Sequence, residues 1–200
     1  MHSVRTTTAA HVNIDEWLNP DSLQYNHTLA EAVFYYSARS TREERLKVCI
    51  ATPEMHKAAW KYAHHSQIIL DGTFGVCNRK MLLFIVMAID DDGKGVPLAF
   101  LLFSAPTKNK QTSAGYDTQI LTELLREWKS ALGTRNGEAF TVHVAITDTD
   151  LMERNTLAAV FDDVWLLICK FHFCQSLRNH RNRMLKGTSP FAHDLKARMK

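Results

Sequence analysis

The sequence is poor in several features that define whole classes of protein. It has only four cysteines in 200 residues, Cys49, Cys77, Cys169 and Cys174, and their irregular spacing argues against a disulfide-rich secreted scaffold. The longest unbroken apolar run, MLLFIVMAI, is nine residues long, which is too short to cross a bilayer. The N-terminal residues contain no apolar stretch of the signal-peptide type. We therefore expect an intracellular protein that is neither secreted nor inserted in a membrane.

Acidic residues are scarce in the C-terminal part of the chain. The net charge is +3 overall, but residues 170–200 contain eight Lys or Arg residues and one acid, a net charge of +7. The rest of the chain is therefore slightly acidic, at −4. A basic end on an acidic body suggests a polyanionic partner. A solvated basic helix face explains the charge equally well.

The spacing of apolar residues divides the chain into two parts. Residues 1–65 are predicted to form a polar tail followed by a helical segment, with Thr52 as a helix N-cap. After His65 the pattern indicates strands alternating with helices. The predicted strands are 67–74, 79–90, 96–105, 139–148 and 164–169. The predicted helices in this second part are 115–133, 151–161 and 171–186.

Two of these strands carry more specific expectations. The apolar run in 79–90 predicts a strand that is buried on both faces. The strict alternation in 139–148 places Phe140, Val142, Val144 and Ile146 on one face. The element order predicts an α/β fold for residues 66–200, with a mixed sheet of three antiparallel strands followed by two parallel ones, flanked by helices. This is the element order of the RNase H-like fold.

Two aspartates could meet in such a sheet. Asp71 lies in the first strand and Asp148 ends the fourth, and these strands are parallel neighbours in an RNase H-like order. Adjacent carboxylates repel one another, and a hard divalent cation such as Mg²⁺ stabilises the pair. Each aspartate taken singly is more often a turn or cap residue. Asp150, followed by Glu153 three residues later, has the pattern of a helix capping box.

The segment after the fifth strand offers two further candidates. Cys169, His172 and Cys174 have a spacing compatible with zinc ligation, although a structural zinc needs four ligands and no second pair is evident. The alternative is a buried strand thiol followed by a helix start. On the helix from His172, a basic stripe could contact phosphates. Alternatively, it could be solvated or packed against a missing C-terminal part of the protein. This stripe consists of Arg178, Arg181, Arg183 and Lys186.

Three motifs together resemble a known family. ILDGTF, ITDTDLMERNTLAAVF and WLLICKFHFCQSLRNHR follow one another between about His65 and Arg183. They resemble the transposase domain of Mutator-like elements, the MULE domain, particularly its fungal-type members. The resemblance implies an RNase H-like DDE fold and cleavage and transfer of double-stranded DNA with Mg²⁺ or Mn²⁺. It also implies a nuclear location and assembly of copies in a transposition complex. Asp71 and Asp148 would occupy the first two acidic ligand positions.

The sequence departs from this family at the third acid. No glutamate follows Glu153, and Asp194 comes too soon for the family's usual helical insertion. We therefore expect a catalytic domain that is incomplete at its C-terminal end and inactive as this chain alone. Three interpretations stay open: a transposase fragment, a domesticated DNA-binding or regulatory protein that does not cut, and a relic open reading frame.

Overall fold

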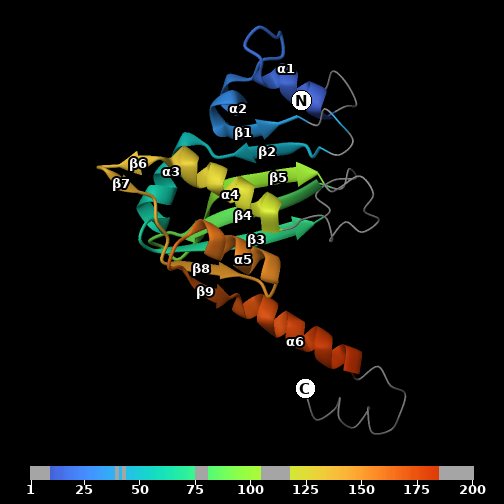
Figure 1. Ribbon diagram of the computed structural model, residues 1–200, viewed down its shortest axis with the longest axis vertical. Coiled ribbons are helices and arrows are strands. Elements are labelled where there is room, and N and C mark those ends of the chain that lie inside the picture. Colours follow the sequence, from blue (N-terminus) through green and yellow to red (C-terminus); the bar gives the residue numbers. More distant parts are fainter. Residues whose placement is uncertain (1–9, 39–40, 42–43, 75–80, 105–117, 185–200) are drawn as a thin grey trace.

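The computed structural model describes residues 10–38, 41, 44–74, 81–104 and 118–184, which form a mixed seven-stranded sheet flanked by helices (Figure 1). The strands pair in the order β1-β2-β5-β4-β3-β8-β9. The first five are antiparallel to their neighbours, and β8 and β9 run parallel to β3. Their bounds are β1 (Val33–Ser37), β2 (Lys47–Ile50), β3 (Gln67–Phe74), β4 (Met81–Ile89), β5 (Gly95–Ser104), β8 (Val144–Thr147) and β9 (Trp165–Ile168).

The helices surround this sheet unequally. Figure 1 shows α3, α4 and α5 over one face, α1 and α2 beside β1, and α6 running away from the body. Among the described residues, no helix has both the length and the apolar character needed to span a bilayer. The helices are α1 (Ala10–Leu18), α2 (His27–Ala32), α3 (Pro53–Ala58), the π-helical turn η1 (Ala59–Ala63), α4 (Thr118–Leu132), α5 (Leu151–Val160) and α6 (Lys170–Met184). A small hairpin joins β6 (Thr134–Arg135) to β7 (Glu138–Ala139).

The two faces of the central strands are buried to different degrees. Leu82 and Phe84 of β4 are 0% exposed and belong to the core cluster that includes Leu124 and Trp128 of α4. Their neighbour Leu83 points to the other side and is only partly buried. We call the helix-covered side the closed face and the other side the open face. The prediction that this strand is buried on both faces is therefore wrong for the open face.

The predicted N-terminal helical segment is only partly present. Helix α1 forms in the predicted polar tail. Of the predicted helical segment, α2 and α3 are present, and Thr52 caps α3 by accepting a hydrogen bond from the Met55 amide at 3.3 Å. Between them, β1 and β2 replace predicted helix, and β2 pairs with β5 so that Cys49 faces Leu101. Short apolar runs such as VFYYS and KVCI satisfy both periodicities. Pairing with the free edge of β5 decides in favour of the strand, because context overrides weak local propensity.

A partly buried ion pair and a tyrosine hydroxyl connect β1 and β2 to α4. The Lys47 ammonium on β2 lies 2.6 Å from the Glu123 carboxylate, and the Tyr35 hydroxyl on β1 donates to the same group at 2.7 Å. Burial is the largest single influence on Glu123 and raises its pKa. The contacts with Lys47 and Tyr35 together outweigh burial, so the pKa of Glu123 is lowered. The N-terminal residues and those after residue 65 thus share one sheet.

The segment 139–148 does not form one continuous strand. Phe140 and Val142 are buried, whereas within β8 the buried residues are Ala145 and Thr147. The alternation shifts by one residue because the chain bends before β8, where the Val144 amide donates to the Ser66 carbonyl oxygen. The prediction that Val144 and Ile146 share one face with Phe140 and Val142 is therefore wrong. They lie on the open face.

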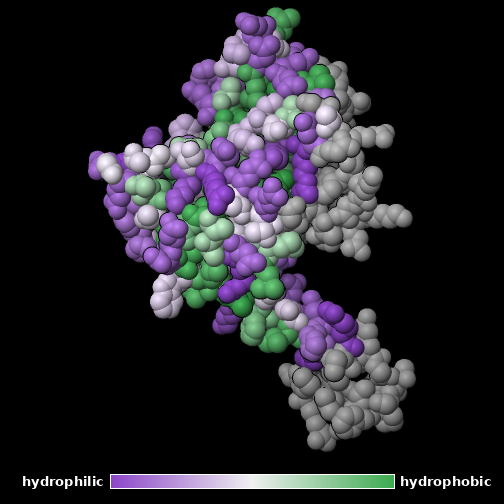
Figure 2. Space-filling model, viewed as in Figure 1, coloured by the Kyte–Doolittle hydropathy of each residue, from purple (hydrophilic) through white to green (hydrophobic). Residues whose placement is uncertain are grey.

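The far edge of the sheet is much more exposed than its centre. Trp165 and Leu167 of β9 are 75% and 48% exposed, and Phe171 at the start of α6 is 67% exposed. Figure 2 shows apolar surface at this end of the body, where β9 passes into α6. The prediction of a buried fifth strand is correct for the strand and wrong for its burial.

Candidate functional site

Asp71 and Asp148 lie on neighbouring parallel strands, as the sequence predicts. Ile69 of β3 pairs with Ile146 of β8, and two residues further along the two strands are Asp71 and Asp148. By the alternation of each strand, both carboxylates extend to the open face. Both residues are partly buried. The fold therefore brings together two carboxylates that are far apart in the sequence.

The loop after β8 orients Asp148 and starts α5. The Asp150 amide donates to Asp148 Oδ1 at 2.6 Å, so one carboxylate oxygen is held by the turn. The Asp150 carboxylate in turn accepts a hydrogen bond from the Met152 amide at 2.7 Å. Asp150 is the N-cap of α5, as predicted.

Glu153 has a different position from the one that its capping pattern predicts. Its carboxyl group does not point outward at the helix start but is buried, with the residue 1% exposed. The Thr147 hydroxyl donates to Glu153 Oε2. A Cβ atom built on Gly72 would lie 3.4 Å from Glu153 Oε1. Glu153 thus contacts the residue before Asp148 and lies against the residue after Asp71, on the closed face of the same two strands.

Burial has a marked effect on the Glu153 carboxyl group. The pKa of Glu153 is raised to about 7, mainly because burial disfavours the charged form; the charges of Asp148, Asp150 and Asp71 also raise it, and the Thr147 hydrogen bond lowers it. A carboxyl group favours its neutral, protonated form where water cannot solvate the charge and other anions lie close. The strand ends therefore carry acids on both faces, with only the open-face pair accessible to solvent.

His172 brings α6 next to the first of these carboxylates. Its Nε2 atom lies 3.9 Å from Asp71 Oδ1, and the two side chains are 31% and 38% exposed. Its Nδ1 atom is buried and has no hydrogen-bond partner in the part of the chain that the structure describes. The imidazole is therefore positioned as a neighbour of Asp71.

A cleft runs from the end of β8 along one face of α6. Its helical side chains recur every three or four residues, which is the spacing of a single helix face. They are hydroxyl, amide, imidazole and guanidinium groups, all capable of contacting phosphate or base edges. The lining residues are Asp148, Thr149, His172, Gln175, Ser176, Asn179, His180 and Arg183.

This cleft includes only part of the predicted basic stripe. Arg183 lines it, whereas Arg178 and Arg181 do not. The Arg181 guanidinium donates to the Asn182 side chain at 3.4 Å. Lys186 lies outside the described residues. The role of the four basic residues in DNA binding stays a prediction.

The ligand atoms of Cys169, His172 and Cys174 are not gathered into one group in the part of the chain that the structure describes. The two cysteines are free thiols, and His172 faces Asp71. In the described ranges, these three residues are not among the groups whose ligand atoms lie within 4.8 Å of one another. A zinc site at Cys169 and His172 stays a prediction.

Comparison with known families identifies the central part of this fold. The model of the MULE transposase domain matches residues 67–176. This range is more than half of the chain, and it runs from β3 to the first half of α6. The chain belongs to the MULE transposase domain family. No curated protein matches it.

The matched MULE range contains the candidate site. It includes Asp71, Asp148, Glu153 and His172, and it ends within the α6 face that lines the cleft. Family membership makes a transposase-related function the starting point and implies DNA as a partner and a divalent metal ion. The family resemblance inferred from the three motifs is thus confirmed at this level.

Sequence reasoning missed two features of the MULE site. The buried Glu153 carboxyl group lies against Gly72 of β3, which is far away in the sequence. The cleft face of α6 carries few charges, so a search for basic residues passes over Gln175 and Asn179. Their helical spacing relative to His172 was the signal that could have revealed this face.

Proposed function

We propose that this MULE domain provides the core of a metal-dependent DNA strand cleavage and transfer site, with Asp71 and Asp148 as ligands of Mg²⁺ or Mn²⁺. The observation that carries the proposal is the placement of these two carboxylates on the open face, with Asp71 within β3 and Asp148 directly after β8. Their strands are adjacent and parallel, and both residues lie within the family match.

The strand order supports an RNase H-like core. Strands β5, β4 and β3 are antiparallel neighbours, and β8 and β9 follow in parallel. This is the arrangement expected of that fold, with β1 and β2 added beyond β5. Function in such a sheet is concentrated where parallel strands end.

The donor atoms suit a hard divalent cation. Asp71 and Asp148 offer carboxylate oxygens, which Mg²⁺ and Mn²⁺ prefer. Such an ion, when bound, activates an attacking hydroxyl and stabilises the leaving oxygen in phosphoryl transfer. The Asp150 amide fixes one Asp148 oxygen, and His172 lies beside Asp71, where it can orient the carboxylate or exchange a proton with a bound group.

DNA is the proposed occupant of the α6 cleft. Amide and hydroxyl groups of Gln175, Ser176 and Asn179 and the Arg183 guanidinium line this surface next to Asp148. Contacts of these types position a nucleic acid backbone. A strand held along α6 would have a phosphate close to the carboxylate pair.

The activity of the chain by itself is proposed to be low. A DDE site needs a third acidic ligand, and the carboxyl group of Glu153 lies on the closed face, bonded to Thr147. Two carboxylates alone form a weak site for Mg²⁺. The alternative function is DNA binding without cleavage, and the polar cleft along α6 favours it because that surface needs no metal.

The test measures Mn²⁺ binding by electron paramagnetic resonance and DNA binding by fluorescence anisotropy in the same preparations. We expect weak Mn²⁺ binding that falls at least tenfold in Asp71→Asn and Asp148→Asn. Asp92→Asn serves as the matched control, because Asp92 is an exposed aspartate in the β4–β5 turn. Nicking of a labelled duplex with Mg²⁺ or Mn²⁺ is assayed in parallel.

The outcomes separate the two functions. Metal binding that depends on Asp71 and Asp148 supports the metal site, and nicking that is lost in the same variants supports catalysis. DNA binding that weakens steeply with salt and persists in both variants, without Mn²⁺ binding, supports the alternative. Mn²⁺ affinity that falls equally in Asp92→Asn would refute the assignment of the site.

A further inference from the structure

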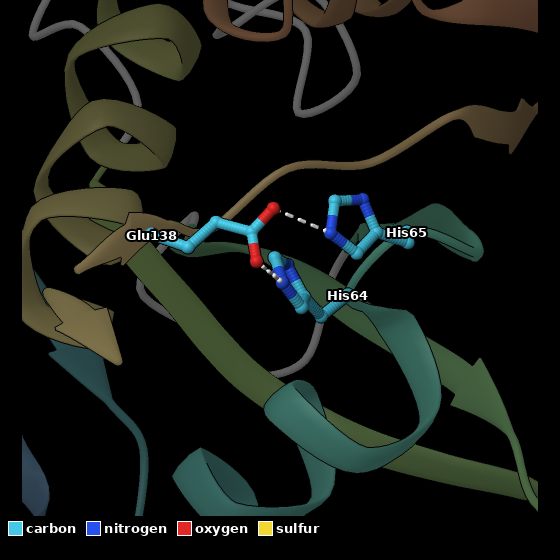
Figure 3. A group of neighbouring side chains, drawn as sticks. All are labelled: His64, His65 and Glu138. Atoms are coloured by element: carbon cyan, nitrogen blue, oxygen red, sulfur yellow. Dashed lines mark hydrogen bonds and ion pairs between the residues drawn. The ribbon is translucent and has the colours of Figure 1, made fainter. Parts of the chain in front are cut away.

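A second group of metal-ligating side chains lies at the opposite end of the β3–β8 pair. His64 and His65 follow η1 and precede β3, and Glu138 belongs to β7. Figure 3 shows both imidazoles turned toward the Glu138 carboxylate. His65 Nε2 lies 2.7 Å from Glu138 Oε1, and His64 Nε2 lies 3.6 Å from Oε2. One ligand atom from each residue lies within 4.8 Å of the others.

The backbone holds the two histidines in this arrangement. His65 has a φ of 55°, a left-handed conformation that is uncommon for a residue other than glycine. Its amide donates to the Thr141 carbonyl oxygen at 3.0 Å, and the Ser66 amide donates to the Ala63 carbonyl oxygen at 3.0 Å. The turn places the two imidazoles with their ring centroids 3.9 Å apart. An unusual conformation that is held by surrounding bonds justifies a search for function.

Thr141 contacts both imidazoles. His65 Nδ1 lies 3.1 Å from the Thr141 hydroxyl, so in the tautomer with Nδ1–H donating to that oxygen the Nε2 lone pair faces Glu138. A hydrogen bond from the second ring nitrogen orients a metal-binding histidine. His64 Nδ1 instead accepts the Thr141 amide at 3.2 Å. Ligation through His64 Nε2 therefore exchanges this long hydrogen bond for a metal bond.

We propose that His64, His65 and Glu138 bind a zinc ion. Zinc bonds of about 2.0–2.1 Å in tetrahedral geometry separate the ligand atoms by roughly 3.3 Å. The distances from the histidine Nε2 atoms to the two Glu138 oxygens, 2.7 Å to Oε1 and 3.6 Å to Oε2, lie on either side of this value, and one ligand atom from each residue lies within 4.8 Å of the others. Two imidazoles with one carboxylate favour zinc over Mg²⁺. His65 and Glu138 are 46% and 56% exposed, which leaves the fourth position to water.

The site would join two separate parts of the fold. Glu138 lies in the small β6–β7 hairpin, whereas the histidines lead into β3. A zinc ion would therefore fasten this hairpin to the start of a central strand. His143, whose ring centroid is 5.3 Å from that of His65, borders the site. The proposal is independent of catalysis at Asp71 and Asp148.

In the experiment, Co²⁺ is titrated into the untagged protein, which carries no polyhistidine tag. Zn²⁺ is then added to displace the Co²⁺. We expect one equivalent of Co²⁺ with the visible absorption of a four-coordinate site, and zinc stabilisation of about 5–10 °C at a hundredfold excess over the Kd. His65→Asn tolerates the left-handed backbone and should lower the affinity at least tenfold. Glu138→Gln, at an exposed position, should do the same without affecting folding.

The chain supplies a matched control and a competing site. His27 and Glu31 form another exposed pair, with 3.4 Å between His27 Nδ1 and Glu31 Oε2, so His27→Ala should leave the affinity unchanged. Cys169→Ser should also leave it unchanged. The proposal is overturned if wild-type chain binds no Co²⁺ or Zn²⁺, or if His65→Asn and Glu138→Gln bind as wild type does. Loss of binding only in Cys169→Ser would likewise overturn it.

Discussion

On the closed face of β3, Gly72 lies against the Phe84 ring and the Glu153 carboxyl group; on the open face of the same strand, Asp71 lies beside His172. The closed-face side chains of β4 are almost fully excluded from water, whereas their open-face neighbours are partly exposed. One strand thus supplies packing on one side and the candidate chemistry on the other. Asp71 and Gly72 are therefore adjacent residues of one strand with unrelated roles, because their side chains lie on opposite faces of the sheet.

The largest expected difference between the faces concerns two adjacent leucines of β4. Leu82→Ala should lower the free energy of unfolding by about 3–4 kcal/mol, because Leu82 is fully buried and its removal leaves a cavity. Leu83→Ala, on the partly exposed side, should cost only about 1 kcal/mol. Urea unfolding of both variants measures the difference. Equal losses would show that the open face is covered as well as the closed face.

The next effect is a dependence on pH that arises from Glu153. Its pKa is about 7 in the folded chain and about 4.3 when unfolded. The folded chain therefore binds more protons between these values, and the free energy of unfolding falls as pH rises from about 4.5 to 7, by roughly 3 kcal/mol. Glu153→Gln should remove this decline. Urea unfolding at several pH values tests it, with the exposed Asp92→Asn as control. A decline that persists unchanged in Glu153→Gln would contradict the prediction.

The smallest of these effects concerns two glycines. In Gly72→Ala, the new Cβ would lie 2.8 Å from Phe84 Cε1, and a fully buried ring cannot move away without disturbing the core. We expect a loss of about 2 kcal/mol. Gly95→Ala meets no atom within 4 Å and should change stability by less than about 1 kcal/mol. Thermal unfolding of the two variants is sufficient, and a neutral Gly72→Ala would exclude close packing at this position.

Sequence reasoning succeeded where the signal is local. The strand at 67–74 has the predicted bounds, and the cap at Asp150 follows from residues two positions away. It failed at β1 and β2, because the pairing of β2 with β5 and of β1 with β2 selects strand over helix there. It also failed for Glu153, whose burial against Gly72 of β3 is a contact between residues far apart in the sequence. The parallel pairing of Asp71 and Asp148 was predicted only because the whole element order was considered.

The same failure explains why His64, His65 and Glu138 were not predicted. Two adjacent histidines before a strand carry no metal signal by themselves. Glu138 lies 73 residues after His65, in the β6–β7 hairpin that follows α4 and precedes β8. Only three-dimensional structure brings such ligands together.

The pairing of β3 with β8 also has a consequence for the order of folding. Strands β3, β4 and β5 are joined by neighbouring segments and can associate as soon as they are synthesised. β8 must wait for the intervening helix α4 before it can pair in parallel with β3. Closing such a long segment is entropically costly and slow. We therefore expect Asp71 to be exposed on a preformed meander before Asp148 reaches it, so the carboxylate pair is among the last parts of the domain to form.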